Sequence, residues 1–161
     1  MEPTERVGGL LTSGLSHSDF HSFESLTGAF LEFSQRVKAH YVKTYGAESE
    51  QAKASFEGTF GEPKVNLMVL EQMLGEQRSV RVSTGLALKR VEKEGARILA
   101  AEWDSIDGGD SVRVTARVFI DGSYEGDLLA MAGVPYHVGR EGKAQYGESL
   151  APEVEEKQLQ A

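Results

Sequence analysis

The chain has 161 residues, enough for one domain with a modest core and too few for a complete two-domain enzyme. Its 17 basic and 25 acidic residues give a net charge of -8, which argues against nonspecific binding to nucleic acid. The absence of cysteine excludes disulfides, thiolate metal sites and a redox-active dithiol, so any redox chemistry requires a bound cofactor.

No apolar run approaches the roughly 18 residues of a membrane span, and the first residues lack the pattern of a signal peptide. We therefore expect a soluble protein without a membrane partner. The compartment stays unknown, with the cytoplasm as the default, because a targeting segment lost by truncation ahead of Met1 would not be visible here.

The first half of the chain predicts two helices. Over residues 24–45 apolar side chains recur at helical spacing, and Gly46 is a typical helix stop. Residues 47–61 are small and polar and predict a loop. Pro63 suits the first turn of a second helix, which we expect to end at Gly75.

The period then changes to that of strands. Residues 86–92, 97–103 and 112–116 predict a three-stranded antiparallel meander, because Glu94-Gly95 and Asp107-Gly108-Gly109-Asp110 have the composition of hairpin turns. Residues 79–83 and 118–121 predict two further strands that belong to a parallel sheet. The single Trp103 fits a core position of the meander. The acidic tail, residues 151–161, is predicted to be a frayed helix or disordered.

The stretch after the last predicted strand is the most informative. An apolar run ends at Asp121-Gly122-Ser123 and leads into a short helix. A buried strand that stops there would leave bare backbone N–H groups and a helix N-terminus at the carboxyl edge of a sheet, where α/β proteins bind ligands. The pattern indicates a site for a phosphate-bearing cofactor.

Two motifs resemble one known family. Residues 120–128 read Ile-Asp-Gly-Ser-Tyr-Glu-Gly-Asp-Leu, residues 132–136 read Ala-Gly-Val-Pro-Tyr, and residues 139–141 read Gly-Arg-Glu. This is similar to the strand and turn that follow the β-meander in FAD-dependent oxidoreductases of the glutathione-reductase-like kind, which show Ala-Thr where this chain has Gly122-Ser123. Residues 2–15, with Asp19 after them, resemble that family's passage from its second strand into its Gly-Gly loop. The likeness runs from Glu2 to Leu150.

The resemblance implies a partial Rossmann-like FAD-binding domain over residues 1–150, in the α/β class, or α+β as a fragment. The family's opening Gly-x-Gly-x-x-Gly turn, whose amides hold the pyrophosphate, has no counterpart in this sequence. We therefore interpret the chain as an internal piece of a flavoprotein, whose partners would be the remainder of that chain and a small-molecule substrate.

The resemblance also implies roles for individual residues. Glu2 would accept hydrogen bonds from the adenosine ribose of FAD, and Val82 would offer main-chain contacts to the adenine. Gly8 and Gly9 would let the backbone approach the cofactor closely. The remaining cofactor-binding candidates lie in the late turn: Asp121, Gly122, Ser123, Gly126 and Asp127.

Plainer interpretations stay open. Glu2 can be an exposed terminal glutamate, and Gly8-Gly9 can be only a tight turn. Asp127 can cap the following helix instead of contacting cofactor. Arg140 and Glu141 can form a structural ion pair or face a substrate anion.

His17, Asp19 and His21 alternate and would share one face of an extended segment, but we expect no metal there without a further strong ligand. No catalytic residue can be named. The sequence thus predicts a fragment of an FAD-dependent oxidoreductase that acts on a small organic substrate. The alternative is a noncatalytic remnant or binding module that keeps the fold and does not hold FAD by itself.

Overall fold

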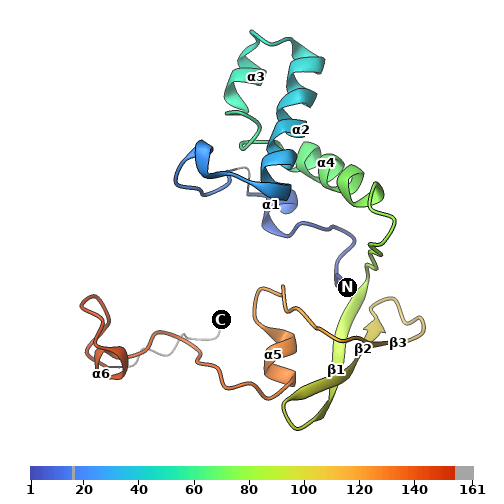
Figure 1. The fold of residues 1–161 in the computed structure, drawn as a ribbon, viewed down its shortest axis with the longest axis vertical. Helices are drawn as coiled ribbons and strands as arrows, with labels where there is room; N and C mark the ends of the chain where they lie inside the picture. The colour runs from blue at the N-terminus through green and yellow to red at the C-terminus, as the bar shows by residue number, and fades with distance from the viewer. Residues whose placement is uncertain (16, 155–161) are drawn as a thin grey trace. The chain divides into compact units, whose positions relative to one another are not determined.

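The computed structural model describes residues 1–15 and 17–154 (Figure 1). It contains short and long helices and one three-stranded sheet, and so confirms the expected mixed α/β class. In chain order the elements are α1 (Leu10–Ser13), a 3-10 turn (Phe23–Ser25), α2 (Gly28–Tyr45), α3 (Glu50–Ala54), α4 (Pro63–Gly75), β1 (Leu86–Glu94), β2 (Arg97–Ser105), β3 (Val112–Thr115), α5 (Asp127–Met131) and α6 (Lys143–Tyr146).

The chain divides into two compact units, each described by itself below. Residues 1–87 and 104–110 form what we call the helical unit, and residues 88–103 with the described residues from 111 onward form the sheet unit. The predicted domain boundary at residue 150 is not tested by this division and stays a prediction. In the described part of the chain, no helix is both long enough and apolar enough to cross a membrane.

The long helix α2 begins later than its apolar pattern suggested. Thr27 is extended and Gly28 has a φ of 59°, so the backbone cannot continue as a right-handed helix toward residue 24. The predicted stop is confirmed, because Gly46 has a φ of 93° and its N–H donates to the Val42 C=O at 2.9 Å.

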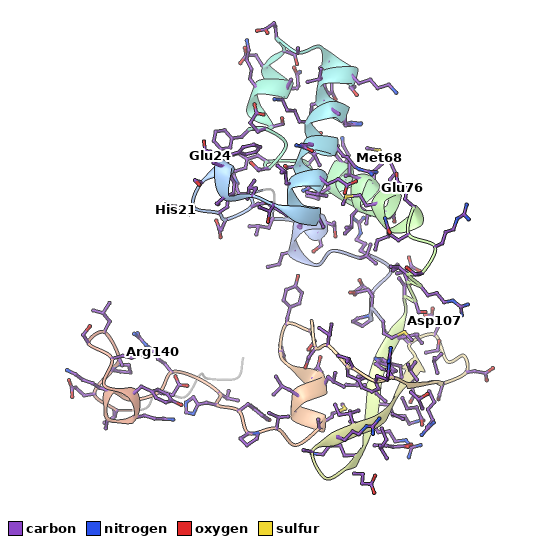
Figure 2. The ribbon with its side chains drawn as sticks, viewed as in Figure 1. His21, Glu24, Met68, Glu76, Asp107 and Arg140 are labelled. Carbon is purple, nitrogen blue, oxygen red and sulfur yellow. The ribbon has the colours of Figure 1, made fainter. Side chains whose placement is uncertain are left out.

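The core of the helical unit lies between three helices. Its buried residues come from α2, α3 and α4: Phe33, Val37, Tyr41, Ala52, Val65 and Val69. Helix α4 has the predicted bounds, with Pro63 in its first turn. Arg36 of α2 also donates two hydrogen bonds of 2.7 Å to Glu76, the residue that follows α4. Glu76 is labelled in Figure 2.

Helix α3 was not predicted, since residues 47–61 were expected to form a loop. Ser49 caps it, because its Oγ accepts a hydrogen bond from the Ala52 N–H at 3.1 Å. A five-residue helix that buries one small side chain, Ala52, gives almost no apolar period to detect.

The antiparallel meander is confirmed. Gly95 and Ala96 join β1 to β2, and Gly95 has the positive φ of 58° that a tight hairpin needs. Strands β2 and β3 pair in a register that places Glu102 opposite Arg113. Ala100 and Ala101 of β2 are both buried, although neighbouring strand residues point to opposite faces of a sheet. Trp103, expected at a core position, is half-buried.

The two predicted parallel strands are wrong. Residues 79–83 and 118–121 are irregular, and the side chains of Val118 and Ile120 are 72% and 88% exposed. An apolar extended segment becomes a strand only where neighbours pair with its main chain along its length and cover its faces. Residues 79–83 have one such contact to a distant segment, from the Glu2 N–H to the Ser83 C=O, and residues 118–120 have none among the described residues. The short helix after this segment, α5, is confirmed.

Residues 151–154 of the predicted tail form no helix, although the C=O of Pro152 accepts a hydrogen bond from the Lys143 N–H at 2.7 Å. Residues 155–161, which carry most of that prediction, lie outside the described residues.

Candidate functional site

Glu2 is held by its main chain beside residues 83–86. Its N–H donates to the Ser83 C=O at 2.9 Å, and its C=O accepts from the Leu86 N–H at 3.2 Å. The residue is half-buried and hydrogen-bonded, unlike a frayed terminal glutamate. The structure therefore pairs Glu2 with Ser83, the residue after Val82, while the ribose and adenine roles of Glu2 and Val82 stay predictions.

The Glu2 carboxylate has one engaged oxygen and one open oxygen. Oε1 accepts from the Thr4 N–H at 2.9 Å and from the Thr4 Oγ1 at 2.7 Å. Oε2 accepts no hydrogen bond from any described residue. An anchored carboxylate with a remaining acceptor suits recognition of a hydroxyl-bearing ligand, because the anchoring contacts fix its orientation before a ligand binds.

The main chain of Val82, like one oxygen of the Glu2 carboxylate, has hydrogen-bonding groups without a described partner. Neither its N–H nor its C=O has a hydrogen-bond partner within residues 1–15 and 17–154, and its side chain is 47% exposed. A donor and an acceptor from one residue match the edge of an adenine ring. The predicted contact thus has the required groups.

Gly8 is needed by the packing of the helical unit itself. A Cβ on Gly8 would lie 2.6 Å from Leu70 Cδ2 and 2.6 Å from Thr12 Cγ2, and its φ is 93°. Gly9 precedes α1, and its C=O accepts from Ser13 Oγ at 2.7 Å. These contacts fit the tight-turn interpretation, while close approach of FAD to this loop stays a prediction.

The late turn is ordered by its own side chains. Asp121 Oδ1 accepts from the Ser123 N–H at 3.0 Å and from Ser123 Oγ at 2.7 Å, and Asp121 Oδ2 accepts from the Leu129 N–H at 2.9 Å. Ser123 Oγ in turn accepts from the Asp127 N–H at 2.9 Å. The hydrogen bond from the Ser123 hydroxyl and that from the Leu129 amide lower the pKa of Asp121.

Backbone N–H groups without partners were expected at the start of α5. For Asp127 and Leu129 this expectation is wrong, because their N–H groups donate hydrogen bonds to Ser123 and Asp121. The capping role considered for Asp127 is also wrong. Gly126 occupies the N-cap with a φ of 73°, and Asp121 is the residue that caps. The Asp-x-Ser spacing of an Asx turn was the signal that could have shown this.

Gly122 has open space where a Cβ would lie, whereas a Cβ on Gly126 would lie 2.7 Å from Leu129 Cδ2. Only Gly126 is therefore required as glycine by the turn. The structure brings Asp121, Ser123, Gly126 and Asp127 together, with Gly122 in the same bend.

The predicted site residues fall into the two separately described units. Glu2, Gly8, Gly9 and Val82 belong to the helical unit, and the late turn belongs to the sheet unit. Whether both line one flavin groove stays a prediction.

The remaining candidates have structural contacts. Arg140 donates to the C=O of Leu150, and no ion pair joins it to Glu141 in the described chain. Among residues 1–15 and 17–154, no three His, Asp or Glu side chains are grouped so that they could hold a metal ion.

Comparison with known proteins shows the family of the chain. No curated protein and no solved structure matches the chain significantly. The family model described as FAD dependent oxidoreductase matches residues 1–160, and the chain therefore belongs to that family.

Proposed function

We propose that the chain is part of the FAD-binding region of a glutathione-reductase-like flavoenzyme that acts on a small organic substrate. The observation that carries the proposal is Glu2, whose main chain is fixed against residues 83–86 and whose Oε2 is open to a ligand. The family match over residues 1–160 supports FAD as that ligand.

In this proposal the helical unit binds the adenosine half of FAD. Glu2 accepts hydrogen bonds from the ribose hydroxyls, and the main chain of Val82 contacts the adenine. The Gly8-Gly9 loop lies close to the cofactor. The Asp121–Asp127 turn stays a candidate contact that only the family resemblance supports. Bound flavin supplies hydride or electron transfer, while protein groups orient the substrate.

A second candidate is a noncatalytic module that keeps this framework without holding FAD. It is favoured by the amides of Asp127 and Leu129, which are already occupied, and by the absence of a Gly-x-Gly-x-x-Gly sequence from the 161 residues. Without a phosphate loop, several charge-assisted contacts of roughly 1.5–3 kcal/mol each are missing. For this chain by itself we expect colourless protein after gel filtration with FAD, and a yellow protein would contradict that expectation.

Adenosine tests the leading proposal without requiring the phosphate contacts. We expect a two-dimensional NMR titration with adenosine to shift the amides of Glu2, Thr4, Val82 and Ser83. We expect 2′,3′-dideoxyadenosine to bind at least about tenfold more weakly, since it lacks the 2′- and 3′-hydroxyls.

The variant Glu2→Gln should weaken adenosine binding by a similar factor. Glu5→Gln, which changes a neighbouring exposed acid, is the matched control and should bind as the wild type does. Equal binding of adenosine and its dideoxy analogue, or shifts confined to other residues, would refute the role assigned to Glu2.

A further inference from the structure

A pocket of about 490 Å³ lies on the helical unit, and neither Glu2 nor Val82 lines it. One side is the loop of residues 17–24 before α2, and the other side is formed by Phe56 and Phe60 after α3. Figure 2 labels His21 and Glu24 on this loop. The volume lies within the usual range of small-molecule sites.

The pocket has a continuous aromatic wall. The Phe56 and Phe60 rings stack with their centroids 5.0 Å apart, and the ring centroid of Phe20 lies 6.5 Å from that of Phe56. His17 extends the row, with its ring centroid 4.2 Å from that of Phe60. The Phe56 side chain is 52% exposed, so part of this wall faces solvent and can contact a ligand.

The charged groups of the pocket are acidic. Asp19 and Glu24 line it, and neither forms an ion pair or hydrogen bond with a described residue. The residues that line the pocket include no Lys or Arg. The Oγ of Ser18, another lining residue, is buried without a hydrogen-bond partner in the described structure. Besides the two carboxylates, the polar lining consists of two serines and two histidines, and no Lys or Arg is present to neutralise the carboxylates.

The backbone of Phe56 and Glu57 has an unfavourable conformation. Phe56 and Glu57 have φ values of 43° and 57°, in the left-handed region that bulky residues rarely adopt. The turn is held against α2 at Gly58, where a Cβ would lie 1.8 Å from the Ser34 carbonyl oxygen, and by the ion pair between Lys38 and Glu57. Strained residues fixed in this way are found preferentially at ligand-binding sites.

We propose that this pocket binds a small organic cation, with its ammonium group between Asp19 and Glu24 and its apolar part against Phe20, Phe56 and Phe60. Aromatic faces attract organic cations, and unpaired carboxylates add a charge-dependent attraction that a neutral ligand of the same shape does not have. The proposal does not depend on FAD, because none of the lining residues is assigned to the flavin.

The test compares two ligands of nearly equal shape on the whole chain without FAD. Benzylammonium chloride and benzyl alcohol are titrated while the amides of residues 17–24 and 55–60 are followed by NMR. We expect benzylammonium to shift these amides and to bind at least about fivefold more tightly than benzyl alcohol. Equal affinities, no binding of the cation, or shifts located elsewhere would overturn the proposal.

Variants separate charge from aromatic contact. The double variant Asp19→Asn with Glu24→Gln should weaken benzylammonium binding about fivefold and leave benzyl alcohol unchanged, whereas Phe56→Leu should weaken both ligands. Glu71→Gln changes an exposed acid of α4 outside the pocket and is the control. If the double variant behaves like Glu71→Gln while circular dichroism shows that all variants are folded, the proposal is wrong.

Discussion

The carboxylate of Asp121 accepts hydrogen bonds from two parts of the surrounding chain. It accepts from Ser123 and from the third residue of α5, Leu129, and so closes the turn and caps the helix with one side chain. A short helix of five residues has little stability of its own, and its start depends on such contacts.

Replacing Asp121 with Ala should therefore loosen the start of α5. We expect the Leu129 amide to lose about 1 kcal/mol of protection, the usual contribution of a capping side chain, as measured by hydrogen exchange. Glu125→Ala, in the same exposed segment, should leave that protection unchanged. Equal exchange in both variants would show that Asp121 does not cap.

The same hydrogen bonds give the turn a pH dependence. They lower the pKa of Asp121 below the ordinary value of 3.8, so its stabilisation is complete above 3.8 and is lost as the pH falls through the lower folded-state pKa. The amide shifts of Ser123 and Leu129 should follow a titration with a midpoint below 3.8. A midpoint at or above that value contradicts the assignment.

Gly58 allows the turn after α3 to touch α2. In Gly58→Ala the new Cβ would overlap the Ser34 carbonyl oxygen and the backbone would keep a φ of 82°, so we expect a loss of about 3 kcal/mol in the free energy of unfolding. Gly46→Ala is the comparison, because it has a φ of 93° with open space around the Cβ and should lose only about 1 kcal/mol. Urea denaturation followed by circular dichroism measures both, and equal losses would contradict the overlap.

At the scale of elements, α2 and α4 hold the helical unit together through small, fully enclosed side chains. Val37 is completely buried in the shared core. Val37→Ala removes two methyl-sized volumes and leaves a cavity, so we expect a loss of about 2 kcal/mol by urea denaturation. Val80→Ala, at a position 46% exposed, should change stability by less than about 0.5 kcal/mol. A similar loss in both variants would place Val37 outside the core.

Elements that carry their own local signal could be predicted from the sequence. Helix α4 combines an apolar period with Pro63 at its start, and the meander combines strand composition with Gly95 in a two-residue turn. The start of α2 could not be predicted from its period alone, because the left-handed Gly28 interrupts a pattern that continues upstream.

Elements that depend on partners could not be predicted. Residues 118–121 have the composition of a buried strand, but strand formation requires neighbouring main chains, which composition does not reveal. For the candidate site, Glu2 is hydrogen-bonded to Ser83 and Leu86, and the roles that the resemblance implies for Glu2 and Val82 stay predictions. The internal use of the Asp121 carboxylate was missed, since an acid after an apolar run can bind a ligand or its own backbone with equal ease.

For the whole molecule, the predicted family is confirmed and its finer subtype stays a prediction. Two motifs in the same order, more than a hundred residues apart, were more informative than either one by itself. The net charge of -8 still predicts that nucleic acid is not a partner. Retention of the protein on a negatively charged (cation-exchange) column would contradict this prediction.

Proteases bind their substrates as extended strands, and they need a stretch of main chain that is not already paired. Residues 118–120 are irregular and make no main-chain hydrogen bonds among the described residues, so the peptide bond after Arg117 should be among the first that trypsin cleaves. Arg113 lies four residues earlier inside β3 and should be protected by its pairing with β2. Mass spectrometry of an early digest distinguishes the two sites. Cleavage after Arg113 at an equal rate would mean that this edge of the sheet opens as readily as the segment that follows it.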